Sequence, residues 1–298
     1  MRDPSELVQL QADLDLDGPV LIEALDGFVD AGHAVNLSRE HLLGSFESEV
    51  IASFDVDELV DHRARRPVLI FNTDHWDGYE RPVLVIHLLR DANQTPFLLL
   101  SGPEPDLQWE RFVAAVQLVI ERLNVRLTIG LHGVPWAIPH TRPMGITAHG
   151  QPRELLTTPP LAIGRVHVPA SVGHLLEYRL GLEGRDAIGF AAHVPHYLAQ
   201  LEYPAAAAAL LAAVEETASL KLSLDSLHDA AAESFASIES QIAHDEQAQA
   251  VIHELEERYD EALREGGGAL PTGEELGAAF EQFLADHQRR TDGDDASI

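Results

Sequence analysis

Apolar runs of strand length alternate with stretches of helical periodicity through the first two-thirds of the chain. The runs are short and rich in branched apolar residues, which is typical of buried strands. They cover residues 19–25, 50–54, 68–71, 83–88, 97–100, 125–131 and 187–193, with weaker candidates at 144–148 and 165–168. Helical spacing of apolar residues follows at 31–42, 106–123, 171–180 and 204–217. Because strands that alternate with helices form a mainly parallel sheet covered on both faces, we expect an α/β protein built as a three-layer α/β/α sandwich.

The pattern changes after residue 217. Residues 219–264 contain long amphipathic stretches without strand-like runs, Gly266-Gly267-Gly268 interrupts them, and a further helix is predicted over 272–288. We therefore expect an α/β/α core domain over residues 1–217, a C-terminal helical domain over 218–288 and a disordered tail over 289–298. The helical domain is expected to lie as a lid over a pocket of the core.

A hairpin-like excursion is predicted between the strands at 68–71 and 83–88. Asp77-Gly78 is a common turn dipeptide, and Trp76 and Tyr79 lie beside it. These aromatic side chains either fold back over the sheet or meet another subunit. Because aromatic residues are enriched in interface cores, we favour Trp76 and Tyr79 as candidate contacts of a homo-oligomer.

Charge and composition narrow the class of partner. The chain has 49 acidic and 20 basic residues, a net charge of -29. Such an excess repels nucleic-acid phosphates and anionic lipids, and no apolar run approaches the roughly 20 residues of a membrane span. Cysteine is absent, which excludes disulfides and thiolate metal sites and fits a reducing compartment. We expect a cytoplasmic protein that binds neither nucleic acid nor membranes.

The loop over residues 130–145 is the first candidate for a site. It follows a predicted buried strand, and its three prolines and three glycines favour a shaped connection. Trp136, His140, Thr141 and Arg142 place an aromatic ring, a titratable group, a hydroxyl and a guanidinium there. Ligand crevices of open α/β sheets lie at the carboxyl ends of strands, so we expect a pocket at this loop.

The loop after the strand at 187–193 is the second candidate. His193, His196 and Tyr197 lie where this strand ends, and they bring two imidazoles and a phenol to one place. If the two strands run in the same direction, both loops open at the same edge of the sheet. We therefore expect the two proline- and histidine-containing loops to enclose one pocket.

The turn over residues 26–34 is the third candidate. It joins a predicted strand to a helix N-terminus, an arrangement that presents free backbone N–H groups to an anion. Asp30 and His33 either line a ligand pocket, or Asp30 caps the helix, which is worth about 1 kcal/mol. We favour the capping role for Asp30 and keep both residues as candidates.

Four blocks in chain order carry a family resemblance. They are Gly27-Phe28-Val29-Asp30-Ala31-Gly32, Gly102-Pro103-Glu104-Pro105 with Trp109 and Phe112, Pro139-His140-Thr141-Arg142-Pro143, and Pro195-His196-Tyr197-Leu198 with Tyr203-Pro204. In this order they resemble the proteasome assembly chaperone 2 family, actinobacterial branch, and the segment 273–284 is similar to that branch's closing helix. The resemblance covers nearly the whole chain.

The resemblance implies a fold and a class of partner. It implies a three-layer core akin to purine nucleoside phosphorylases and peptidyl hydrolases, a helical extension near the pocket, and a protomer that self-associates, taken here as a trimer. Eukaryotic members are assembly chaperones of the proteasome α-ring, so proteasome subunits are one expected partner and an anionic small molecule is another. Archaeal relatives that dock on proteasomes carry a tyrosine near the C-terminus. This chain ends Asp-Asp-Ala-Ser-Ile, so we do not expect docking through the tail.

Three functions fit these residues. In a phosphorylase- or hydrolase-like enzyme, Arg142 would hold a small anionic substrate while His140 or His196 transfers a proton, yet no Walker loop or nucleophile elbow is present. A metal site drawn from His132, His140, His193 and His196 lacks a known ligand motif, so we expect no metal and no cofactor. Binding without turnover needs fewer specific residues than catalysis or metal binding does. We therefore predict a binding or assembly protein.

Overall fold

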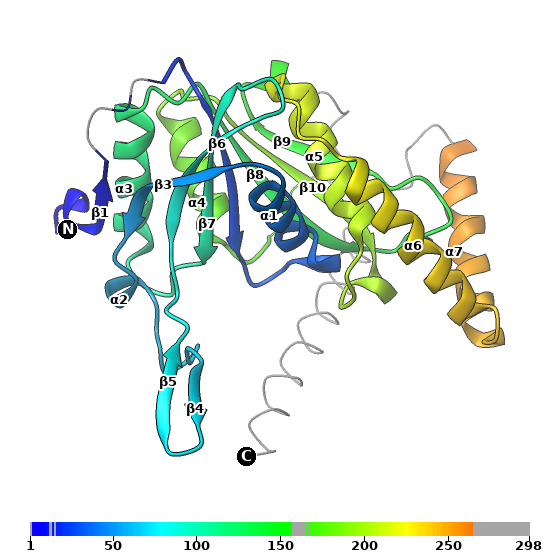
Figure 1. Cartoon of the computed structure of the whole chain (residues 1–298). Helices are drawn as coiled ribbons and strands as arrows, with labels where there is room; N and C mark the ends of the chain where they lie inside the picture. Colours follow the sequence, from blue (N-terminus) through cyan, green and yellow to red (C-terminus); the bar gives the residue numbers. More distant parts are fainter. Residues whose placement is uncertain (1, 12–13, 15, 157–164, 166, 265–298) are drawn as a thin grey trace.

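The computed structural model describes residues 2–11, 14, 16–156, 165 and 167–264. Within this part of the chain, the central layer is an eight-stranded sheet of order β1-β3-β6-β7-β2-β8-β10-β9 (Figure 1). Its strands are β1 (Val8–Leu10), β2 (Val20–Asp26), β3 (Ser48–Phe54), β6 (Val85–Arg90), β7 (Pro96–Pro103), β8 (Leu127–Trp136), β9 (Ile146–Gln151) and β10 (Ala187–Pro195). The helices are α1 (Ala34–Ser45), α2 (Val56–Leu59), α3 (Trp109–Arg122), α4 (Val172–Leu182), α5 (Pro204–Ala218), α6 (Asp225–Ile242) and α7 (Glu246–Arg264). Short 3-10 turns lie at Pro4–Leu7, Ala31–His33, Arg153–Leu155 and His196–Leu198.

The centre of the sheet is parallel. Strands β7, β2, β8 and β10 run in one direction, and the outer pairs β1–β3, β3–β6, β6–β7 and β10–β9 are antiparallel. A parallel pair needs a crossover of about a dozen residues or more, whereas residues 91–95 alone connect β6 to β7. The predicted sheet is thus parallel at its centre, where its strands are buried on both faces, and antiparallel on its flanks.

Helices cover both faces of this sheet. Alternate residues of β2 enter two separate apolar clusters. Val20 and Ile22 pack with α1 and α5, and Leu21 and Leu25 pack with α3 and α4. Complete burial of an aliphatic side chain of this size contributes about 1.5–3 kcal/mol, so both clusters hold the helices firmly on the sheet. The predicted α/β/α sandwich is confirmed.

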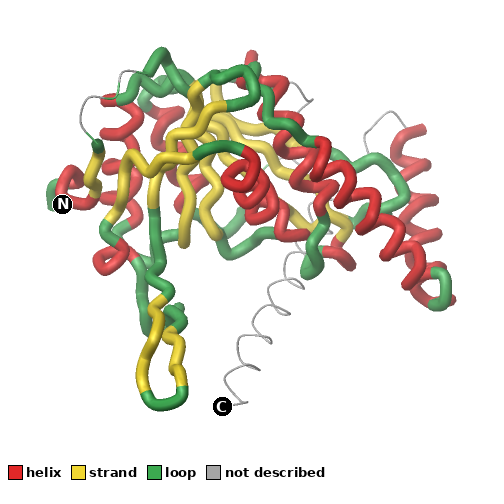
Figure 2. Tube along the Cα trace, viewed as in Figure 1, coloured by secondary structure: helices red, strands yellow, loops and turns green. Residues whose placement is uncertain are grey.

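A two-stranded hairpin projects from the body of the molecule (Figure 2). It consists of β4 (Leu69–Asn72) and β5 (His75–Tyr79), so the hairpin-like excursion predicted between the runs at 68–71 and 83–88 is confirmed, and only the predicted position of its turn is wrong. The turn lies at Thr73 and Asp74, and Asp77-Gly78 belongs to β5. Gly78 lies opposite Ile70 beside a register shift, where a Cβ atom would come within 3.0 Å of the Ile70 side chain. Glycine at this position therefore permits close pairing within the hairpin rather than a turn.

The helical extension is continuous with the core. Leu227 and Ile238 of α6 belong to the apolar cluster of α1 and α5, and α7 follows antiparallel to α6 after a short turn. The division of the chain at residue 217 stays a prediction, as does the lid. The predicted helix over 272–288, the tail over 289–298 and part of the strand candidate at 165–168 lie outside the described residues. None of the helices in the described part is both long and apolar enough to cross a bilayer.

Candidate functional site

The carboxyl ends of the parallel strands meet along one edge of the sheet. Strands β8 and β10 stay in register to their last residues, where Trp136 lies opposite Pro195. Because the two strands are parallel neighbours, the loops that follow them leave the sheet side by side. The backbone N–H of His140 in the first loop donates a 2.8 Å hydrogen bond to the hydroxyl of Tyr197 in the second.

The His140 ring is enclosed by its own chain. Its Nδ1 lies 2.8 Å from the Tyr197 hydroxyl, and its Nε2 lies 2.9 Å from Oε1 of Glu239 on α6. The side chain of His140 has no exposed surface. Burial raises the pKa of Tyr197 above its ordinary value, so this hydroxyl stays protonated. His140 therefore joins the two loops to α6.

Thr141 and Arg142 are held by α7. The Arg142 guanidinium donates two hydrogen bonds of 2.9 Å to the two carboxylate oxygens of Asp260, and a third of 3.0 Å to Glu256. The Thr141 hydroxyl also bonds to Glu256. The hydrogen bond from Arg142 lowers the pKa of Asp260, so this carboxylate stays ionised. The donors that were predicted to hold an anionic ligand instead bind carboxylates of α7.

His193 and Trp136 form a stacked pair beneath the first loop. Their ring centroids are 4.0 Å apart and their planes differ by 3°. His193 Nε2 lies 2.6 Å from the Thr147 hydroxyl on β9, and burial lowers the pKa of His193 to about 4. The pKa of the half-buried His196 is also lowered by burial. Both imidazoles are thus favoured in their neutral form near pH 7.

Asp30 makes its side-chain contacts with α1 rather than with these groups. The Asp30 carboxylate accepts hydrogen bonds of 2.8 and 3.1 Å from the backbone N–H groups of Val35 and Asn36, in the first turn of α1. Burial raises the pKa of Asp30, and these two hydrogen bonds partly offset that effect. His33 is exposed. The contacts of Asp30 are those of a residue that caps a helix.

The two candidate interface residues lie on the projecting hairpin. Trp76 and Tyr79 of β5 are 64% and 53% exposed, and Phe71 contacts Trp76 edge to face at a centroid distance of 5.0 Å. Exposed apolar side chains continue through the hairpin and its base at Val68, Leu69, Ile70 and Val83. Contact with a second copy through these residues stays a prediction.

A cavity of about 720 Å³ opens beside the predicted residues, at the carboxyl edge of the sheet. Among the candidate residues, all of which lie in the described part, Trp136 alone lines it. The walls include Leu25, Val35 and Leu131, and no described residue of α6 or α7 lines it. Its polar lining includes Glu23, Glu104, His132, His149, Arg153 and His174. The chemistry of this cavity therefore comes mostly from residues that sequence reasoning did not select.

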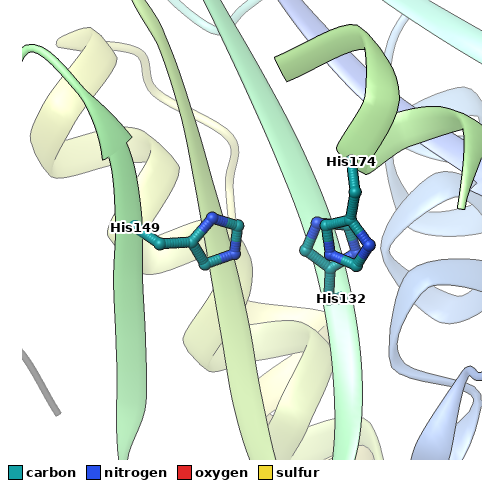
Figure 3. Close-up of side chains that lie close together, drawn as sticks. All are labelled: His132, His149 and His174. Carbon is teal, nitrogen blue, oxygen red and sulfur yellow. The ribbon is translucent and has the colours of Figure 1, made fainter. Parts of the chain in front are cut away.

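Three imidazoles converge in this cavity (Figure 3). His132 comes from β8, His149 from β9 and His174 from α4, and one ring nitrogen from each lies within 4.8 Å of the other two. The rings of His132 and His174 are 4.3 Å apart, and those of His132 and His149 are 5.6 Å apart. Burial, with the neighbouring His174 and His149, holds the pKa of His132 well below its ordinary value. A neutral imidazole has a lone pair, so this group can bind a cation.

Two carboxylates flank these imidazoles. Glu177, one turn after His174 on α4, lies 3.0 Å from His149 Nδ1. Glu23 on β2 is buried, and its pKa is raised to about 7. Burial is the main cause, and Glu104 and Glu177 add to it, whereas the hydrogen bond from the Leu25 N–H acts in the opposite direction. Sequence reasoning considered His132 with other histidines and missed His149 and His174. No fixed spacing could have identified them, because the three residues meet only through the pairing of strands and the packing of α4.

The family follows from a match over most of the chain. A family model described as the PAC2 family matches residues 24–242. The chain belongs to the PAC2 family. This agrees with the resemblance carried by the loops around Asp30, His140 and His196. The PAC2 chain matches none of the curated proteins with which it was compared.

Solved structures include similar PAC2-like chains. Rv2714 of Mycobacterium tuberculosis, a protein of unknown function, is 47% identical with a TM-score of 0.83, and the match covers 87% of this chain and 90% of that one. A protein of unknown function from Corynebacterium glutamicum is 38% identical with a TM-score of 0.82, covering 86% and 98%. Rv2125 of Mycobacterium tuberculosis, a proteasome-assembly chaperone homologue, is 26% identical with a TM-score of 0.72, covering 78% and 99%.

Proposed function

We propose that this PAC2 protein is a cytoplasmic binding and assembly factor, which works as a homo-oligomer and receives a ligand or partner segment at the carboxyl edge of its sheet. The observation that carries this proposal is the cavity of about 720 Å³ at that edge. Binding sites for small molecules are concave, mostly apolar and about 300–1,000 Å³ in volume, with a few converging polar groups. The similarity to Rv2125, a proteasome-assembly chaperone homologue, supports a protein partner such as a proteasome subunit.

The hairpin supports self-association. Phe71, Trp76 and Tyr79 are all more than half exposed on a two-stranded element that projects from the body. An isolated hairpin is marginally stable in water, and large exposed apolar patches mark interaction sites. A second copy, in a trimer as expected from the family, would bury these rings.

The alternative, an enzyme acting on a small anionic substrate, receives less support. Its predicted anion-binding group, Arg142, is occupied by Asp260 and Glu256. The cavity itself carries the carboxyl groups of Glu23 and Glu104 against a single described arginine, Arg153, so its lining does not favour an anion.

Two substitutions separate the roles of the cavity and the hairpin. Ala191→Phe places a ring in the cavity and should abolish capture of isolated proteasome α-subunits, or of the small molecules that copurify with the protein, as measured by native mass spectrometry. Leu182→Phe, at an exposed position of α4, is the matched control. The double substitution Trp76→Ser and Tyr79→Ser should instead reduce the mass in light scattering to that of one chain. Unchanged capture by Ala191→Phe would contradict the role of the cavity.

A further inference from the structure

The three histidines of the cavity form a group that the binding role does not require. We propose that His132, His149 and His174 bind one divalent transition-metal ion of the zinc class, with a fourth coordination position open to the cavity. The ring nitrogens already lie within 4.8 Å of one another. In a tetrahedral zinc site, Zn–N bonds of about 2.0–2.1 Å correspond to nitrogens about 3.3 Å apart, so binding would contract the group by at most about 1.5 Å. His174 is exposed on the first turn of α4, which leaves its side chain free to make this movement.

Hydrogen bonds direct two of the three rings. His149 Nδ1 lies 3.1 and 3.0 Å from the two carboxylate oxygens of Glu177, and His174 Nδ1 lies 2.8 Å from the Ser171 hydroxyl. In the tautomer that donates from Nδ1, the lone pair is on Nε2. A ligand histidine in a metal site commonly donates its other ring N–H to a carboxylate, as His149 does to Glu177. The same contacts therefore orient Nε2 of both rings for a metal.

The third ring is without a hydrogen bond. The His132 imidazole stacks on its two histidine neighbours and forms no hydrogen bond to any residue in the described part of the chain. The lone pair of this half-buried ring is therefore not used by the chain and is available to a ligand in the cavity. A metal ion at the centre of the group would accept that lone pair.

Glycines of two paired strands leave room for the rings. Gly130 of β8 and Gly189 of β10 are register partners. A Cβ atom on Gly189 would lie 2.7 Å from His149 Nε2, and one on Gly130 would lie 3.2 Å from His132 Nε2. The two Nε2 atoms thus lie over the same pair of glycines. Any larger residue at position 189 would displace the His149 ring.

Glu23 lies beside the three histidines. Its Oε2 is 3.4 Å from the same Cβ position on Gly130 that lies near His132 Nε2. Three protein ligands and an open position are typical of catalytic zinc sites, in which the fourth ligand is water or an oxygen atom of a bound molecule. Imidazole ligands suit zinc, copper, iron and nickel, and a carboxylate beside the site adds attraction for a cation. The expected fourth ligand is therefore a water, or an oxygen of a ligand in the cavity, hydrogen-bonded to Glu23.

Metal titration of the full chain tests this assignment. Protein stripped with a chelator is titrated with Zn²⁺ by calorimetry and with Co²⁺ by visible absorption, and we expect one equivalent with the spectrum of a four-coordinate ion. Azide should change the Co²⁺ spectrum, because it enters the open position. His174→Ala and His149→Ala should each remove the site, whereas His228→Ala, at an exposed histidine of α6, should bind as the wild type does. His174 is exposed, so His174→Ala should not disturb folding. It therefore tests the site even if His149→Ala, at a partly buried position, affects folding.

A variant of Glu177, the carboxylate bonded to His149, tests the orientation of the ligands. Glu177→Gln keeps the shape of the side chain but removes its charge, and we expect zinc affinity to fall about 10–100-fold with the melting temperature of the metal-free protein unchanged. Failure of the stripped wild type to bind Zn²⁺, or binding by His174→Ala equal to that of His228→Ala, would overturn the assignment. Loss of metal with retained capture of α-subunits would leave the binding function intact, so the two proposals fail separately.

Discussion

Two regions at the carboxyl edge of the sheet are rich in histidine, yet they differ in what surrounds the side chains. In the loop of His140, the side chains of His140, Thr141 and Arg142 already have partners on the second loop, α6 or α7. In the cavity of His132, His149 and His174, the rings face each other and an open volume. A polar group that is fully paired within its own chain contributes to stability, whereas a converging group that faces a cavity is available to a ligand. This difference separates structural from binding histidines better than their position in the sequence does.

The largest effect on stability is expected at His193, on the border between the two regions. Its pKa is about 4 in the folded protein, against about 6.5 when unfolded, so the folded state disfavours the proton. The contribution of neutral His193 to the free energy of unfolding is fully present above pH 6.5. As the pH falls from 6.5 to 4, up to about 3 kcal/mol of this free energy is lost. His193→Gln should abolish this part of the pH dependence in urea unfolding measured between pH 7 and pH 4. Parallel curves for the variant and the wild type would show that folding does not lower the pKa of His193.

The second prediction compares a histidine-to-alanine substitution in each of the two regions. His140→Ala removes a fully buried side chain together with its bonds to the Tyr197 hydroxyl and to the half-exposed Glu239, and it should lower the free energy of unfolding by about 2 kcal/mol. His174→Ala, on the exposed side of the cavity, should change that free energy by less than about 0.5 kcal/mol in metal-free protein. Denaturation in urea at pH 7 measures both. Equal losses would remove the distinction between the two regions.

The smallest effect is expected at Arg142. Arg142→Ala removes the bonds to Asp260 and Glu256, so the amides of α7 should exchange hydrogen faster while those of the core stay protected. The pair is at the surface, and the melting temperature should fall by less than about 4 °C. Arg185→Ala, which breaks an exposed pair with Glu121, is the matched control. A large fall in melting temperature with unchanged exchange in α7 would show that Arg142 supports the core instead.

Much of the fold could be predicted because its cause is local. Alternating and helical periodicities follow from which side chains enter the two apolar clusters, so β2, α3 and α5 lie close to the expected ranges. The hairpin was predicted, but the position of its turn was wrong. Asp77-Gly78 has the composition of a turn, but Gly78 packs against Ile70 within the hairpin, and Thr73 and Asp74 make the turn. Turn propensity alone does not determine register.

The candidate residues could be predicted only in part, because their partners are distant in sequence. The sequence placed His140 and Tyr197 on two loops of one edge, and the parallel pairing of β8 with β10 brings them within hydrogen-bonding distance. It did not indicate that Glu239 and Asp260, on helices far along the chain, would bind His140 and Arg142. His149 reaches His132 because β9 pairs antiparallel with β10, a long-range contact without a signature in spacing.

The projecting hairpin has one further consequence for the molecule. None of its residues from Leu69 to Tyr79 belongs to either apolar cluster of the core, and its two ends lie together, with the backbone N–H of Glu80 donating to the carbonyl oxygen of Val68 at 3.0 Å. It is therefore a modular insertion. A short turn in its place would shorten the chain without opening the interior, and grafting the hairpin onto another sheet would transfer its aromatic surface as a unit.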